Sequence, residues 1–167
     1  MNNTQLLYSE KQRFRQWWLW LLVFIGPVLF AWFILQQIIL NSPAGNNPAN
    51  DLILLISGAI FGIGLPFFIY SCGLDTEVRS NGVYVRFRPF HRKSIFYSFK
   101  DIKTVESVTY SPIKDYGGWG IRYGKLGKAY NVSGNKGVHL KFSSGPNLLI
   151  GSQENQLLYD SIINHID

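Results

Sequence analysis

The sequence predicts two transmembrane helices joined to an α+β domain. Residues 17–40 and 52–74 contain no charged side chain, and a membrane-spanning helix needs about 20 mostly apolar residues. From residue 75 onward the chain is polar, basic and rich in glycine, with short segments in which apolar and polar side chains alternate. We therefore expect a cytoplasmic N-terminal segment (1–15), a two-helix transmembrane hairpin (16–74) and a cytoplasmic domain (75–167).

The first helix is expected to begin in the N-terminal segment. Ser9 and Gln12 have the spacing of a capping box, which predicts a helix start near Glu10. A cleaved signal peptide would also have basic residues before an apolar run. Its apolar core spans only about 7–15 residues, however, so the longer run here favours a membrane helix.

The distribution of lysine and arginine predicts the orientation in the membrane. Basic residues lie before the first apolar run and after the second, whereas residues 41–51, which connect the two runs, contain none. Loops rich in Lys and Arg stay on the cytoplasmic side. We expect a multi-pass protein of the cell inner membrane with both termini in the cytoplasm.

The second apolar run contains a small-residue motif. Gly58 and Gly62 have the Gly-x-x-x-Gly spacing, which lets two helix backbones approach closely in lipid. The partner of this face is either the first helix of the same chain or another subunit.

The domain after residue 75 is expected to be mostly β-structure. The residues Val83, Val85 and Phe87 alternate with polar side chains after an Asn81-Gly82 turn, which predicts a hairpin. An amphipathic helix is predicted at residues 152–165. The remaining predicted strands cover residues 95–99, 102–110, 120–123, 128–132, 138–142 and 148–150.

About seven strands followed by one helix is the order of a pleckstrin-homology-like (PH-like) barrel. Residues 116–122 (YGGWGIR), 129–135 (AYNVSGN) and 149–152 (LIGS) resemble the PH-like domains of small bacterial membrane proteins with two N-terminal transmembrane helices, an uncharacterised family. The Glu10-x-Gln12-x-Phe14 pattern is similar to those proteins too. The resemblance implies a barrel with one C-terminal helix, but no reaction, because PH-like folds include lipid binders and protein docking modules alike.

The residues that could perform catalysis are scattered. His91, His139 and His165 lie on different predicted elements, and Cys72 is the single cysteine. Metal sites and nucleophilic centres need several ligands or an oriented base at matched spacing. We therefore expect no enzyme activity, no metal and no cofactor.

Two residues in the glycine-rich segment are candidates for binding a protein partner. Trp119 and Arg122 combine a large aromatic ring with a guanidinium group, a composition typical of interface centres. An ion pair or cation–π contact within the chain is the alternative for Arg122.

The domain carries a strong positive charge. Residues 79–141 hold thirteen lysines and arginines against three acids, and each basic side chain near anionic headgroups contributes about 1 kcal/mol. The densest cluster, His91, Arg92 and Lys93, is either a lipid-binding site or a solvated loop. Nucleic acid is not expected as a partner, since no reading motif for it is present.

These observations favour a non-enzymatic, membrane-anchored adaptor or assembly module. It would dock a protein partner, or associate with itself, at the inner membrane face. The alternative is a peripheral reader of anionic lipid headgroups that acts through the basic juxtamembrane domain.

Overall fold

The computed structural model describes residues 4–43 and 45–166. The chain forms two compact units. One unit is Phe14–Ser71, and the other combines the described residues up to Arg13 with those from Cys72 onward.

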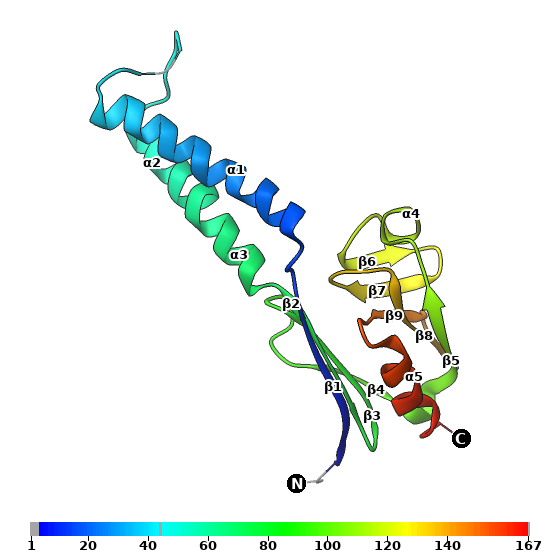
Figure 1. Cartoon of the computed structure of the whole chain (residues 1–167). Helices are drawn as coiled ribbons and strands as arrows, with labels where there is room; N and C mark the ends of the chain where they lie inside the picture. Colours follow the sequence, from blue (N-terminus) through cyan, green and yellow to red (C-terminus); the bar gives the residue numbers. More distant parts are fainter. Residues whose placement is uncertain (1–3, 44, 167) are drawn as a thin grey trace. The chain divides into compact units, whose positions relative to one another are not determined.

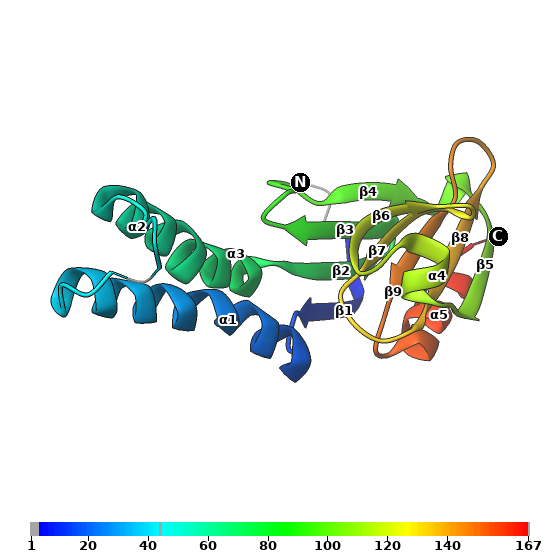
Figure 2. The same ribbon diagram turned by 90° about the horizontal axis from the view of Figure 1, so that it is seen from above.

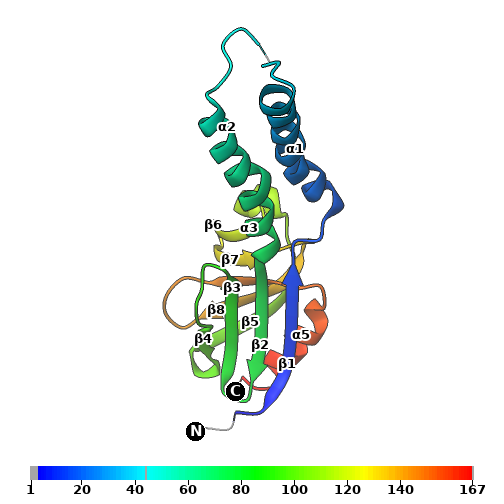
Figure 3. The ribbon, with the colours of Figure 1, turned by 90° about the vertical axis from the view of Figure 1, so that its left-hand side faces the viewer.

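The helical unit is an antiparallel pair. Helix α1 (Trp17–Ile34) continues into the π-helical turn η1 (Leu35–Ile39), and the second helix consists of α2 (Asp51–Ser57), the π-helical η2 (Gly58–Gly64) and α3 (Leu65–Ser71). The two helices lie side by side (Figures 1 and 3). Their continuous lengths are 23 and 21 residues, long and apolar enough to cross a membrane.

Nearly all apolar side chains of this unit point outward. Trp17, Ile63 and Phe67 are 74%, 72% and 71% exposed. The core helices of a water-soluble protein bury such residues, and a contiguous apolar surface of this extent marks contact with a membrane or with other protein. The helices therefore have an apolar surface that the helical unit itself leaves uncovered.

The second unit contains two sheets. The first sheet is antiparallel in the order β1-β2-β3-β4, with β1 at Leu6–Arg13, β2 at Gly73–Arg79, β3 at Gly82–Arg88 and β4 at Ile95–Ser98 (Figure 3). The β2–β3 pair confirms the hairpin predicted around Asn81.

The expected helix start near Glu10 is wrong, because residues 6–13 form strand β1. This strand pairs with β2 at the edge of the first sheet, and its side chains bind the second sheet. The buried Gln12 Nε2 donates to the Gly151 carbonyl at 2.7 Å. The Glu10 carboxylate accepts from Ser152 Oγ at 2.6 Å and from the Gln153 amide at 2.9 Å. The Glu10-x-Gln12 pattern is therefore a contact between the two sheets.

The second sheet has the order β5-β8-β9-β7-β6, in which only β7 and β9 pair in parallel (Figure 2). The 3₁₀ turn η3 connects it to β4, a short helix α4 precedes β6, and α5 is the last element along the chain. The bounds of these elements are η3 Phe99–Asp101, β5 Ile102–Thr109, α4 Pro112–Tyr116, β6 Gly120–Gly124, β7 Gly127–Asn131, β8 Lys136–Phe142, β9 Leu148–Gly151 and α5 Asn155–Ile163.

The predicted closed barrel is not present among the described residues. They form two separate sheets with nine strands, rather than one barrel of about seven. The C-terminal helix is confirmed but is shorter than predicted. It contacts β1 and β2 of the first sheet and β5 and β8 of the second. Leu158 and Ile162 are fully buried there, so α5 joins the two sheets through their shared apolar core.

Candidate functional site

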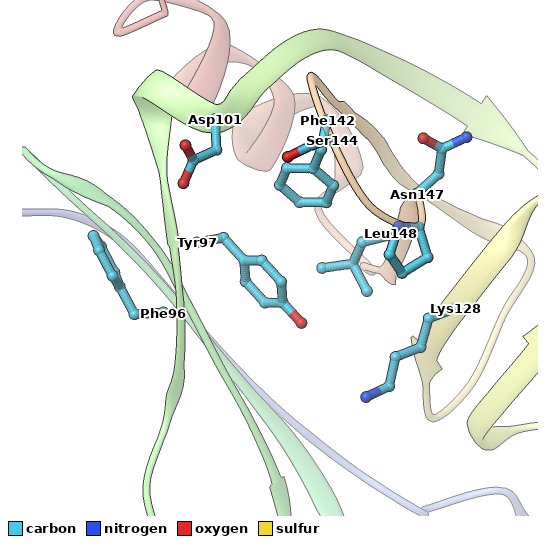
Figure 4. A pocket seen from close by; sticks show the side chains of 9 residues that line it. Phe96, Tyr97, Asp101, Lys128, Phe142, Ser144, Asn147 and Leu148 are labelled. Atoms are coloured by element: carbon cyan, nitrogen blue, oxygen red, sulfur yellow. The ribbon is translucent and has the colours of Figure 1, made fainter.

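A cavity of about 320 Å³ lies between the two sheets of the β-rich unit. Strand β4 and turn η3 form one side, and β7, β8, β9 and the β8–β9 loop form the other. Its size is at the lower end of the range for small-molecule sites, about 300–1,000 Å³. The lining residues are Phe96, Tyr97, Asp101, Lys128, Phe142, Ser144, Pro146, Asn147 and Leu148 (Figure 4).

A lysine held by aromatic rings marks one end of the cavity. Lys128 Nζ lies 4.7 Å from the centre of the Tyr130 ring and 5.6 Å from that of Tyr123. Within the described chain, no carboxylate comes within 4.0 Å of this ammonium group. The ring faces attract the ammonium group but carry no net negative charge, which leaves the group able to attract an anion.

Tyrosine hydroxyls gather around the same lysine. The Tyr97 ring stacks on Phe142 with centres 5.5 Å apart, and its hydroxyl points toward the Lys128 end (Figure 4). Burial raises the pKa of Tyr97, and the adjacent Tyr130 hydroxyl raises it further. Burial also raises the pKa of Tyr130. Both hydroxyls are therefore protonated at neutral pH and can donate hydrogen bonds. We call Tyr97, Tyr123, Lys128 and Tyr130 the Lys128 cluster.

The opposite end of the cavity is negatively charged. Asp101 lies there on η3, away from Lys128 (Figure 4). Phe142 and Leu148 provide apolar surface between the two ends, and Ser144 and Asn147 add polar groups to the lining. The cavity thus has a cationic end, a middle with apolar surface and an acidic end.

Of the three residues predicted to bind lipid, His91 packs and hydrogen-bonds within the β-rich unit. Its ring meets Tyr130 edge-on at 5.4 Å, and its Nδ1 accepts a hydrogen bond from the Phe87 amide at 3.1 Å. Burial, followed by the positive charge of Lys128, lowers the pKa of His91. The imidazole is consequently neutral at pH 7, with its proton on Nε2.

Arg92 and Lys93 are exposed in the β3–β4 loop, beside Phe90, which is 59% exposed. This loop leaves the first sheet at the end where Arg13, Gly73 and Arg88 are aligned across three strands. The positive charge of the predicted cluster therefore rests on two side chains next to an exposed aromatic ring.

At that same sheet end, Asp75 joins three strands by ion pairs. Its carboxylate lies 3.0 Å from Arg13 Nη1 and 2.9 Å from Arg88 Nε. The strands that continue into the two apolar helices are thus fastened to each other where the chain enters and leaves the helical unit.

The structure brings Trp119 and Arg122 together. Arg122 Nε donates to the Trp119 carbonyl at 2.9 Å, and the Trp119 indole donates to the Gly134 carbonyl at 3.2 Å. Gly118 and Gly120 have φ values of 125° and 119°, which side chains rarely tolerate, so glycine is required on both sides of Trp119. Neither Trp119 nor Arg122 lines the cavity.

Gly58 and Gly62 face α1 of the same chain. A Cβ atom on Gly58 would lie 3.1 Å from Ile34 Cδ1, and one on Gly62 would lie 3.8 Å from the Pro27 Cα. Of the two partners considered for this motif, the helical unit provides the first helix of the same chain.

Replacing Gly58 with leucine should force the two helices apart. Overpacking of a close contact costs about 1–3 kcal/mol, and we expect a lower thermal unfolding midpoint for the detergent-solubilised chain. The Ile53→Leu variant is the control, since Ile53 is 59% exposed. Equal midpoints for the two variants would show that the small-residue contact is incidental.

The sequence interpretation did not identify the Lys128 cluster. Alternation in β7 indicates only that Lys128 and Tyr130 share a face. The opposing position of Tyr97 depends on how the two sheets pack, which no local pattern encodes. The one available signal was a tyrosine in each of two predicted strands, Tyr97 and Tyr130, because a buried tyrosine hydroxyl usually has a polar partner.

Comparison with known proteins gives a family but no characterised relative. The described residues contain no group of three His, Cys, Asp or Glu side chains suited to hold a metal ion. No curated protein and no solved structure matches the chain. The model of a family of unknown function, DUF6141, matches residues 1–167, and the chain therefore belongs to this family.

Proposed function

We propose that the protein is a non-enzymatic, membrane-anchored docking module. The exposed apolar surface of the two helices carries this proposal, because a bilayer would cover it. Strand β1 ends at Arg13 just before α1, and β2 begins at Gly73 just after α3. Two neighbouring strands therefore connect the β-rich unit to the anchor, and this unit would present its surfaces to partners at the membrane.

We further propose that both termini and the β-rich unit lie in the cytoplasm at the inner membrane. The basic flanks and the uncharged loop between the helices support this orientation. A reporter fused after Asp167 should register the cytoplasm, and one inserted near Asn47 should register the outer compartment. The reverse pattern would refute the orientation.

The docking surface that we propose includes Trp119 and Arg122. Exposed apolar side chains lie on neighbouring elements: Ile113 on α4, which contacts β6, and Leu126 in the β6–β7 turn. Aromatic rings and arginine beside exposed apolar groups are typical of protein interface centres. The occupant is a protein partner or a second copy of this chain.

Purification in a mild detergent, followed by mass determination, tests this proposal. We expect a homo-oligomer or a stoichiometric partner. Arg122→Lys should weaken that association about tenfold or more, because lysine lacks the planar group that bonds the Trp119 carbonyl. Lys103→Arg, an exposed change on β5, is the control. A monomer without partner at every concentration would contradict docking.

One observation favours a second candidate, a reader of anionic lipid headgroups. Phe90, Arg92 and Lys93 lie in a loop at the sheet end from which β1 and β2 continue into the apolar helices. Basic side chains next to an exposed ring are suited to an anionic bilayer surface.

Amide exchange of the full chain in lipid nanodiscs tests this second candidate. A fragment that begins at residue 75 would lack β1, so the full chain is required. The β3–β4 loop should be better protected in phosphatidylglycerol than in phosphatidylcholine, and high salt should remove the difference. Arg92→Gln with Lys93→Gln should abolish it. Equal protection in both lipids would exclude headgroup reading by this loop.

A further inference from the structure

The cavity between the sheets has the features of a ligand site, independent of membrane or partner. It combines residues from β4 and η3 with residues from β7, β8 and β9, which come together only in the folded unit. Loops and strand ends that converge on a mixed polar and apolar cavity are common positions for small-molecule binding.

The charge at one end of the cavity selects for an anion. Lys128 has aromatic rings as its close neighbours, at 4.7 and 5.6 Å, and the Tyr97 hydroxyl points into the same space (Figure 4). An ammonium group and a hydroxyl donor together can bind both oxygens of a carboxylate by charge-assisted hydrogen bonds. A neutral ligand would leave this charge without a counterion.

The rest of the cavity limits what the anion can carry. Phe142, Pro146 and Leu148 provide an apolar wall, which favours a ring or a short hydrocarbon body. Asp101 at the far end repels a second negative charge. The volume of about 320 Å³ accommodates a small organic molecule rather than a nucleotide or a lipid chain.

We propose that this cavity binds a small organic monoanion, a carboxylate with an aromatic or short aliphatic body. Its carboxylate contacts Lys128 and Tyr97, and its body lies against Phe142 and Leu148. This inference goes beyond the docking proposal, because it requires neither a membrane nor a protein partner.

Benzoate and its neutral isostere benzamide are suitable probes for the full chain in a nonionic detergent. Ligand that binds only the folded state stabilises it by RT ln(1 + L/Kd), where L is the free ligand concentration, so at equal concentration a tighter ligand raises the unfolding midpoint more. We expect benzoate to raise the midpoint with about millimolar affinity, given its few atoms, and benzamide to bind about tenfold more weakly. Equal shifts with both probes, or none with benzoate, would overturn the proposal.

Variants test whether the rise of the unfolding midpoint with benzoate comes from binding in the cavity. Lys128→Met should weaken benzoate binding about tenfold or more, Lys128→Arg should retain it, and Tyr97→Phe should weaken it less than Lys128→Met. Lys125→Met, an exposed change on the same hairpin, is the matched control for the benzoate salt. If Lys125→Met and Lys128→Met had equal effects, the anion would not be bound at Lys128.

A dianion tests the assigned orientation. Terephthalate has a second carboxylate at the far end of its ring, where Asp101 would repel it, so it should bind more weakly than benzoate. Asp101→Asn should narrow this difference, because loss of the negative charge strengthens terephthalate binding more than benzoate binding. Equal binding of the two anions to the unaltered chain would overturn the assigned orientation.

Discussion

Replacing Leu158 with alanine is expected to destabilise the β-rich unit by about 2–5 kcal/mol. Leu158 is fully buried on α5, which contacts strands of both sheets. The cavity left by the shorter side chain lies in the core that the two sheets share, so neither sheet can close it alone. Such a loss is a large fraction of the total stability of an ordinary domain.

The neighbouring residue provides a matched control for this prediction. Leu157 is on the same helix and 58% exposed, so Leu157→Ala should change stability by less than about 0.5 kcal/mol. Urea unfolding of the detergent-solubilised chain, followed by circular dichroism, measures both variants. Similar midpoints for the two would mean that α5 does not join the sheets.

Local patterns correctly predicted the elements whose contacts are close in sequence. The two apolar helices follow from run length, and the β2–β3 hairpin follows from the alternation of Val83, Val85 and Phe87 around a two-residue turn. In both cases the partner segment is adjacent along the chain, so periodicity and turn residues are sufficient.

The elements that the sequence did not reveal depend on distant partners. Strand β1 pairs with β2 across the whole helical unit, and its charged residues Glu10 and Lys11 gave no strand signal. The parallel pairing of β7 with β9 passes over β8, and it contributes to a second open sheet rather than a barrel. Tertiary contacts thus overrode the local capping-box pattern.

The candidate site likewise contains features that local sequence predicted and features that depend on distant partners. Glycines with positive φ around Trp119 agree with the glycine-rich segment seen in the sequence, and Arg122 follows only three residues after Trp119. The Lys128 cluster, by contrast, combines β4 of the first sheet with β6 and β7 of the second, so it forms only when the two sheets pack together. Sequence alone indicated the charge of the domain, but not the cavity in which one of its lysines lies.

In the N-terminal strand β1, Glu10→Ala should destabilise the β-rich unit by about 2–4 kcal/mol. The Glu10 carboxylate accepts from Tyr8 OH at 2.8 Å, from Ser152 Oγ at 2.6 Å and from the Gln153 amide at 2.9 Å. Ser152 is buried, so its hydroxyl loses its acceptor without access to bulk water.

Lys11→Ala is the control, since Lys11 is exposed on the same strand and successive strand residues point to opposite faces. Glu10→Gln should have an intermediate effect, because its carbonyl oxygen still accepts one of these bonds while the charge is lost. Amide exchange of residues 6–13 gives the second readout. In Glu10→Ala these amides should exchange faster than in Lys11→Ala, because β1 would separate from β2 more often once its contact with residues 151–153 is weakened. Identical exchange and identical unfolding midpoints in the two variants would show that pairing with β2 alone holds the strand, and that the Glu10 contact with the second sheet contributes nothing.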